Sequence, residues 1–187
     1  QHNAPLVDNA VQKLLPEIAI LDAAATENAL QGIAEAIEAA LKAPQPVTHL
    51  STGEAKVLEV AGNRRVQVID GKVGKMRGSG SKDPELRALP EGLIDPFLKT
   101  VSFWNGEKKL AALHYYATHP MSYYGDGIVS HDFAGIAREK RTQEDGVPHI
   151  YFTGCGGNIG AGKYNDGTPP MRPLLAGRIH AAMVESE

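Results

Sequence analysis

Apolar residues recur with helical spacing in three segments of the chain. Between residues 26 and 42, leucine, isoleucine and alanine side chains fall on one stripe, the glutamates lie off it, and Pro44 closes the segment. This pattern predicts an amphipathic helix that packs its apolar stripe against a core. Two further amphipathic helices are expected over 132–144 and 172–184.

Strand-like segments lie between these helices. Runs of this kind occupy 47–60, 66–70, 98–104, 109–117 and 148–153. Asn105-Gly106 joins the third run to the fourth, which predicts a hairpin. Residues 71–92 are rich in Gly, Ser, Lys and Pro and are expected to form a long surface loop. Together these elements predict an α/β fold, a mixed sheet with flanking helices, and no linker divides it into two domains.

The amino-acid composition excludes several classes of protein. The 187 residues are 42% hydrophobic and 22% charged, with a net charge of −3 and a sequence pI near 6.2. This balance is typical of a globular protein and shows no basic footprint for nucleic acid. A single cysteine, Cys155, excludes an internal disulfide and a cysteine-based zinc cluster. No apolar run reaches about 18 residues, so no transmembrane segment is expected.

His119 is the first candidate for chemistry. It lies in Ala117-Thr118-His119-Pro120, directly after an expected strand, where a sheet can fix a side chain beside a loop that admits substrate. Imidazole is a natural zinc ligand at physiological pH. A histidine at a strand end is more often a satisfied structural residue, so the local motif leaves both interpretations open.

Ser130-His131-Asp132 is the second candidate, placed where the helix over 132–144 should begin. The loop between this motif and His119 is polar and turn-prone, and a loop with reactive groups at both ends can close over a site. In the alternative interpretation, Asp132 or Ser130 caps the helix and His131 is an exposed loop residue.

A glycine-rich run over residues 154–162 follows the strand expected at 148–153. Its five glycines let the backbone approach a ligand closely. Residues 157–163 also match the spacing of a phosphate-binding P-loop. However, Tyr164 replaces the hydroxyl residue that would hold magnesium, and Pro169-Pro170 prevents the helix that should bind phosphate. A P-loop nucleotide-binding protein is therefore a distant alternative.

Short motifs follow one another along the chain in a characteristic order. They are Gln1-His2-Asn3-Ala4-Pro5, Ser51-Thr52-Gly53-Glu54, Asn63-Arg64, Asp95 to Trp104, Ala117-Thr118-His119-Pro120 and Ser130-His131-Asp132. Their order and spacing resemble the N-terminal catalytic domain of the neutral/alkaline (non-lysosomal) ceramidase family. The resemblance extends over nearly the whole chain and is more specific than any single motif.

This resemblance implies a zinc-dependent hydrolase that cleaves the N-acyl amide bond of ceramide, a sphingolipid, or of a related small-molecule or lipid-like substrate. His119 would be a zinc ligand, and His2 would be the second histidine of an early pair close to the metal. Arg64 and the Ser130-His131-Asp132 motif would contact substrate. The remaining zinc ligands would lie outside residues 1–187, which are expected to be part of a larger catalytic domain cut at both ends. Because family members are commonly exported, a secreted or periplasmic location is expected.

The glycine-rich run differs from the family's motif. The family has Asn-x-Gly-Asp-x-Ser-Pro-Asn with a catalytic serine, and alignment on Gly157 puts Asn158 in place of the aspartate and Gly160 in place of the serine. Backbone N–H groups of the run can stabilise an oxyanion without that serine, so Gly157, Asn158 and Gly160 are catalytic candidates. A hydrolase acting on another substrate and a non-catalytic binding module of the same fold are the two interpretations that remain.

Overall fold

A computed structural model of the chain describes residues 13–14, 23–125, 127 and 129–187. His2, one of the catalytic candidates, lies outside the described residues. The chain divides into two compact units, residues 1–46 and 47–187, at a point where the sequence shows no clear linker.

The first unit contains the helix α2, Ala23–Leu41, close to the bounds that the apolar periodicity predicts. Its stripe is exposed, however, with large apolar side chains 49% to 72% accessible at Leu30, Ile33, Ile37 and Leu41. The helix is therefore confirmed, while the predicted packing of its stripe against a core is not found among the described residues of this unit.

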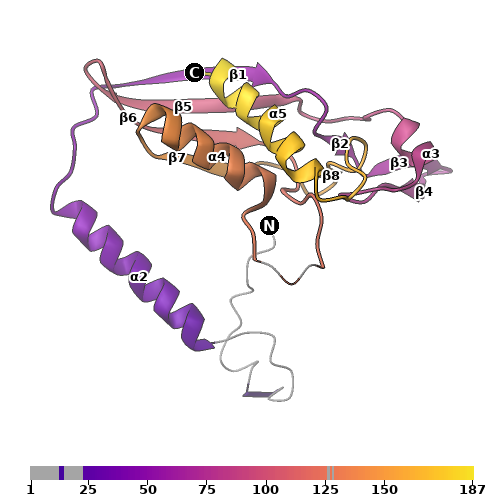
Figure 1. Cartoon of the computed structure of the whole chain (residues 1–187), viewed down its shortest axis with the longest axis horizontal. Helices are drawn as coiled ribbons and strands as arrows, with labels where there is room; N and C mark the ends of the chain where they lie inside the picture. Colours follow the sequence, from indigo (N-terminus) through magenta and orange to yellow (C-terminus); the bar gives the residue numbers. More distant parts are fainter. Residues whose placement is uncertain (1–12, 15–22, 126, 128) are drawn as a thin grey trace. The chain divides into compact units, whose positions relative to one another are not determined.

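The second unit is built on a four-stranded mixed sheet (Figure 1). Its strands, in spatial order, are β1 (His49–Lys56), β5 (Phe97–Asn105), β6 (Lys108–Tyr116) and β7 (His149–Thr153). β1 and β6 each pair antiparallel with β5, and β7 pairs parallel with β6. The predicted α/β fold with a mixed sheet is confirmed, as is the hairpin at Asn105-Gly106, where Gly106 has a φ of 57°.

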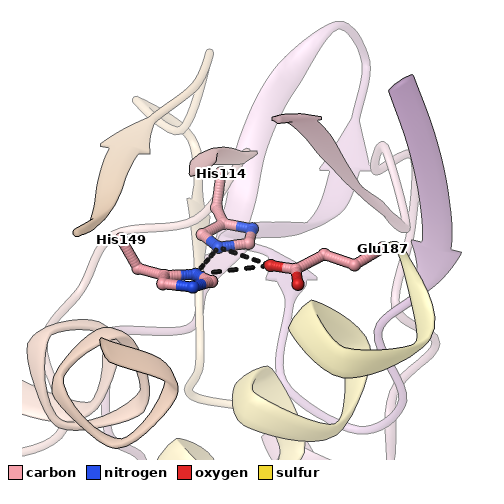
Figure 2. A group of neighbouring side chains, drawn as sticks. All are labelled: His114, His149 and Glu187. Atoms are coloured by element: carbon pink, nitrogen blue, oxygen red, sulfur yellow. Dashed lines mark hydrogen bonds and ion pairs between the residues drawn. The ribbon is translucent and has the colours of Figure 1, made fainter. Parts of the chain in front are cut away.

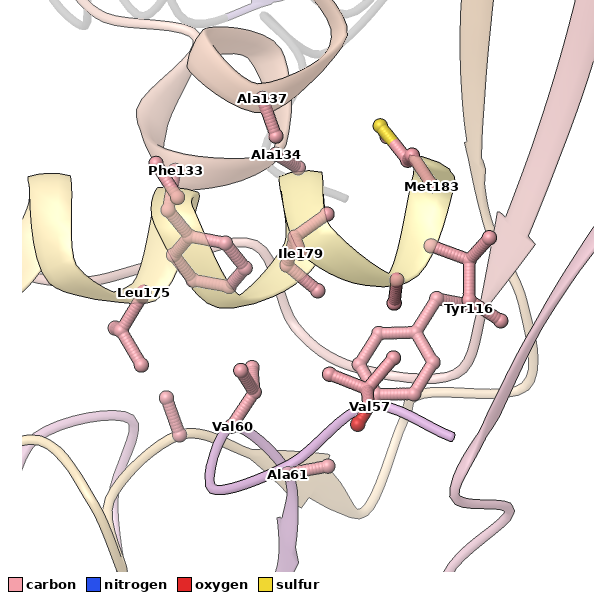
Figure 3. Packing of buried hydrophobic residues seen from close by; sticks show 14 of the residues in the cluster. Val57, Val60, Ala61, Tyr116, Phe133, Ala134, Ala137, Leu175, Ile179 and Met183 are labelled. Atoms are coloured by element: carbon pink, nitrogen blue, oxygen red, sulfur yellow. The ribbon is translucent and has the colours of Figure 1, made fainter. Parts of the chain in front are cut away.

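Two helices, α4 (Asp132–Asp145) and α5 (Met171–Glu185), pack against each other and cover one face of this sheet (Figure 1). The core lies between them and the sheet (Figure 3). Its fully buried members include Leu98, Tyr116, Phe133, Leu175, Ile179 and Met183. α4 is the connection between the parallel strands β6 and β7, and it ends at Gly146 in the left-handed conformation.

The start of α4 differs from the expectation. The N-cap residue is His131, and it makes no side-chain capping bond. Asp132 has a φ of 51°, and its carboxylate accepts from Phe133 N–H at 2.7 Å and from Ser122 N–H at 3.0 Å. Ser130 Oγ accepts from Asp132 N–H. The predicted N-cap at Asp132 or Ser130 is therefore wrong, because His131 occupies that position. The two side chains instead accept from the first two amides of the helix, and Asp132 also binds the preceding loop at Ser122.

Residues 71–92 form more structure than the predicted surface loop. They contain β4 (Lys72–Met76), paired with β3 (Arg65–Ile69), and the short helix α3 (Pro84–Ala88). The segment also buries three polar side chains, at Arg77, Ser79 and Ser81. Arg77 can be buried because its guanidinium donates to the carbonyls of Asn63, Leu86, Leu89 and Pro90 at 3.0–3.1 Å.

A last pair of short strands, β2 (Gly62–Asn63) and β8 (Ile159–Gly160), joins this region to the glycine-rich run. Among the described residues, no helix has the length and apolar character needed to cross a membrane.

Candidate functional site

The candidate site lies where the parallel strands β6 and β7 end side by side. Tyr116 and Thr153 are paired at the ends of the two strands, and the amide of Gly154 donates to Tyr116 O at 3.0 Å. The chain then turns on both sides, and His119 N–H donates to Ile159 O at 3.1 Å. The loop that carries His119 and the glycine-rich run are therefore held together by the backbone.

The His119 ring is fixed by the same run. Its Nδ1 atom lies 3.0 Å from Gly156 O, and the ring is partly buried. A carbonyl oxygen only accepts, so Nδ1 carries the proton and Nε2 is the unprotonated nitrogen of the neutral ring. This second interaction gives His119 the tautomer and the fixed orientation that metal-binding histidines have.

Close packing of backbones accounts for two glycines in the run. A Cβ atom on Gly156 would lie 3.0–3.2 Å from backbone atoms of Thr118, and one on Gly162 would lie 2.1 Å from Gly78 O. The glycine at 156 lets the run approach the His119 loop, and the glycine at 162 lets it approach the segment after β4. The predicted close approach therefore serves the neighbouring chain segments at these two positions.

Arg64 lies on the other side of the glycine-rich run. Its amide donates to Asn158 O at 2.8 Å, and its Cδ atom is 3.7 Å from the position that a Cβ on Gly160 would take. Arg64 Nε and Thr118 Oγ1 are buried with no hydrogen-bond partner among the described residues. Buried polar atoms are normally satisfied, so these two indicate a place for water or a ligand group.

Four of the predicted site residues thus gather around one run: His119, Asn158, Gly160 and Arg64. Gly157 is exposed beside them. The amides of Gly157 and Asn158 donate to no acceptor within the described part of the chain, whereas those of Gly156 and Ile159 donate to Gly154 O and Gly156 O. The first two amides are therefore the ones able to meet an oxyanion.

The Ser130-His131-Asp132 motif has a different setting. His131 is exposed and lies 3.3 Å from Glu139, and Asp132 is buried with its carboxylate on Ser122. Asp132 holds the far end of the loop that begins at His119. A substrate contact by this motif stays a prediction.

Asn165 and Arg172, which hold this loop at Ser122 and Tyr123, were not among the residues predicted for the site. Asn165, fully buried, donates from Nδ2 to Ser122 O at 2.6 Å and to Ser79 O at 2.8 Å. Arg172 donates to Ser122 Oγ at 3.0 Å and stacks on the Tyr123 ring at 3.7 Å. Asn165 lies in a stretch whose pattern indicates only a turn, so its role becomes visible only through these long-range contacts.

The P-loop interpretation is wrong. Lys163 Nζ donates to the carbonyls of Arg87 and Leu89 at 3.0 and 2.6 Å, which engages the amine that would bind phosphate. The next helix in the described part of the chain begins only at Met171, so the run does not lead directly into a helix N-terminus as a P-loop does.

An open pocket of about 460 Å³ adjoins the ends of β6 and β7. Its wall is mostly apolar, with Leu93, Ile94, Phe97, Tyr115 and Ile159. Asp95, Lys99 and Asn158 add polar groups. A pocket of this kind suits a ligand with an apolar body and a polar end.

Comparison with known proteins gives a similarity in fold to solved structures. No family model and no curated protein matches the sequence. Neutral ceramidase from Pseudomonas aeruginosa superposes with a TM-score of 0.61 at 20% identity, over 83% of this chain and 25% of that one. A ceramidase complexed with C2 gives 0.56 at 19% identity, over 76% of this chain and 22% of that one.

The fold is that of part of neutral ceramidase. The chain spans about a quarter of the length of the solved ceramidases that it resembles. The resemblance expected from the ordered motifs is thereby confirmed at the level of the fold.

The ceramidase-like fold raises the question of whether these residues suit a zinc ion. His119 does, because its tautomer presents Nε2 as the ligand nitrogen. Within the described residues, the one group of three metal-binding side chains is a different one, His114, His149 and Glu187. His119 belongs to no such group of three within the described part of the chain.

The glycine-rich run allows a direct test of this geometry. A Cβ on Gly160 would meet its nearest neighbours, Ser79 and Arg64, at 3.5–3.7 Å, which is ordinary contact. Gly160→Ser should therefore change the free energy of unfolding by less than about 1 kcal/mol. Gly162→Ala, which drives a Cβ into Gly78 O, should cost about 2–3 kcal/mol. Urea unfolding of both variants tests this, and an equal loss in the two would contradict the described packing.

Proposed function

We propose that this chain carries part of the active site of a zinc-dependent hydrolase that cleaves an N-acyl amide bond in a lipid-like substrate. The observation that carries the proposal is the His119–Gly156 hydrogen bond, at the joined ends of β6 and β7, in a fold shared with neutral ceramidase. A zinc ion held there would polarise the scissile carbonyl and lower the pKa of a bound water.

His119 supplies the metal ligand from this chain. Gly156 O fixes the ring by accepting from Nδ1, and His119 N–H is itself anchored on Ile159 O. Both contacts come from the glycine-rich run, so the position of the ligand depends on that run. His2 is the expected second histidine near the metal.

Arg64 and the exposed amides of the run bind the substrate. The guanidinium offers forked donors for a polar head group or carbonyl. The Gly157 and Asn158 N–H groups lie on the same run as the carbonyl that holds His119, and they stabilise negative charge on the substrate oxygen. The apolar pocket beside β6 accommodates an acyl chain or another apolar group.

Gly160 favours a second candidate function. It stands where the ceramidase motif has its serine, so this chain brings no hydroxyl at that position. A binding module that recognises a lipid-like ligand without cleaving it would have the same fold and the same pocket. Release of a free fatty acid from bound substrate separates the two functions.

Zinc stoichiometry tests the ligand assignment. In the larger catalytic domain that would supply the remaining ligands, we expect His119→Ala to lower the zinc content by one equivalent, measured by elemental analysis after equilibration with zinc. His49→Ala is the matched control, because His49 is exposed and stacks on Trp104 outside the site. An unchanged zinc content in His119→Ala, or an equal loss in His49→Ala, would remove the basis of the proposal.

A further inference from the structure

A second group of potential metal ligands is buried in the second unit, away from His119. His114 lies on β6, His149 is the first residue of β7, and Glu187 follows α5 (Figure 2). His114 Nε2 lies 2.8 Å from His149 Nδ1, and Glu187 Oε1 lies 3.6 and 3.3 Å from these two nitrogens. Both imidazoles are fully buried, and the Glu187 side chain is 10% exposed.

Each of the three side chains is held by a partner on its outer atom. Thr100 Oγ1 lies 2.8 Å from His114 Nδ1, and Asp145 Oδ2 lies 2.9 Å from His149 Nε2. Glu187 Oε2 accepts from Lys109 at 2.6 Å and from Arg141 at 2.7 Å. This leaves His114 Nε2, His149 Nδ1 and Glu187 Oε1 directed at one another. Outer partners of this kind orient the ligands of metal sites.

The hydrogen bonds allow the two inner nitrogens to be unprotonated together. Ser186 Oγ donates to Met183 O at 3.0 Å and lies 2.6 Å from Thr100 Oγ1. Thr100 can therefore donate to Ser186 and accept from His114 Nδ1, which leaves a lone pair on His114 Nε2. His149 donates from Nε2 to the Asp145 carboxylate, which leaves a lone pair on Nδ1. In this arrangement, two lone pairs and a carboxylate oxygen converge, so a cation between them is stabilising.

The ionisation states suit such a cation. Burial lowers the pKa of His114 to about 4, so its ring is neutral at physiological pH. Burial raises the pKa of Glu187, but hydrogen bonds from Lys109 and Arg141 outweigh burial and hold it below its usual value. Neutral imidazole and ionised carboxylate are the forms that bind metal.

We propose that His114, His149 and Glu187 bind one divalent transition-metal ion, of the zinc class, at a site separate from that of His119. Tetrahedral zinc with bonds of about 2.05 Å holds its ligand atoms about 3.3 Å apart. The distance from Glu187 Oε1 to His149 Nδ1 is already 3.3 Å. The distance between His114 Nε2 and His149 Nδ1, which is 2.8 Å, needs to increase by about 0.5 Å. His149 begins β7 whereas His119 contacts the residues after its end, so roughly 13 Å of strand separates the two sites.

The surrounding charge sets the affinity of this site. Lys109 and Arg141 balance Glu187 and Asp145, so a divalent cation adds net positive charge to the cluster. Two imidazoles with one carboxylate nevertheless favour zinc, cobalt, nickel or copper over calcium and magnesium, which prefer oxygen ligands. The fourth position is left to water, because the inner faces of the cluster offer these three ligand atoms.

The experiment uses the full chain with His119→Ala, which removes the ligand of the other proposed zinc site. We expect this protein to bind one equivalent of zinc in competition with a chromophoric chelator. Adding His149→Gln should weaken that binding by at least about 100-fold. Adding His49→Ala, an exposed histidine outside the cluster, should leave it unchanged.

Cobalt substitution gives a measurement that does not depend on a second mutation. Cobalt(II) in the His119→Ala protein should show the intense visible absorption of a four-coordinate ion. The spectrum of hydrated cobalt alone, or zinc binding that His149→Gln leaves unchanged, would overturn the proposal. If His119→Ala by itself removes all zinc, the second site is refuted while the function proposed for His119 stands.

Discussion

Arg77→Leu is expected to lower the free energy of unfolding by about 3–5 kcal/mol. Arg77 is 1% exposed, and its guanidinium donates to four carbonyls, those of Asn63, Leu86, Leu89 and Pro90. Leucine fills part of the volume but provides no donor, so four carbonyl oxygens lose their partner inside the protein. Urea unfolding followed by circular dichroism measures the loss.

Arg87→Leu is the matched control for this prediction. Arg87 is also an arginine of the segment between β4 and β5, but it is partly exposed and donates to Lys163 O at 3.4 Å. Its replacement should cost less than about 1 kcal/mol. If the two variants lose the same stability, the Arg77 contacts are not what holds the segment in place.

The contacts of Arg77 also bear on the candidate site. Because Asn63 precedes Arg64, the bond from Arg77 to Asn63 O helps to position Arg64, the proposed substrate-binding arginine.

His119→Ala is expected to reduce amide hydrolysis by about 10³-fold or more, which corresponds to about 4 kcal/mol of transition-state stabilisation. The reason is that this chain contributes one fixed ligand nitrogen, Nε2, to the proposed zinc ion, and alanine removes it. The contact of His119 Nδ1 with Gly156 O is partly exposed, so the fold should survive the change with a loss of about 1 kcal/mol.

His49→Ala serves again as the control, because this histidine is exposed and far from the glycine-rich run in the sequence. It should keep the activity of the unmodified protein. Equal activity of His119→Ala and His49→Ala would show that His119 has no part in the reaction, even if the protein does hydrolyse the substrate.

The regular elements of the second unit could be predicted from local sequence. The β5–β6 hairpin follows from the two strand-like runs on either side of Asn105-Gly106, and β7 matches its predicted run to within one residue. Helices α4 and α5 begin and end within a residue or two of their apolar periodicity. In each case the pattern and the packing surface lie in the same short segment, so periodicity alone is sufficient.

The buried polar residues could not be predicted in the same way. Arg77 lies in a run of glycine, serine and lysine that is typical of a surface loop, and it is buried because its acceptors come from two other segments. His114 shares a strand face with Ala112 and Tyr116, which indicates that it points inward. Its partners His149 and Glu187 come from distant parts of the chain, and no local pattern joins them.

The candidate site could be predicted in part, less completely than the helices and strands but better than the buried polar residues. Local sequence favours a structural role for His119, and only the order of distant motifs indicates a ligand. The structure places the ring against Gly156, 37 residues further along, which supports the fixed orientation that a ligand needs. The glycine-rich run has a double role that its composition alone does not reveal, because it holds His119 and also contacts Arg64.

The most direct test of the central claim is the rate at which the protein releases fatty acid from an N-acyl sphingosine, measured before zinc removal, after chelation and after zinc is restored. The proposed function predicts hydrolysis that is lost on chelation, returns with about one equivalent of zinc at the His119 site, and is absent throughout in His119→Ala. Hydrolysis that persists in the metal-free protein, or binding of the substrate with no release of fatty acid in the zinc-loaded protein, would contradict it.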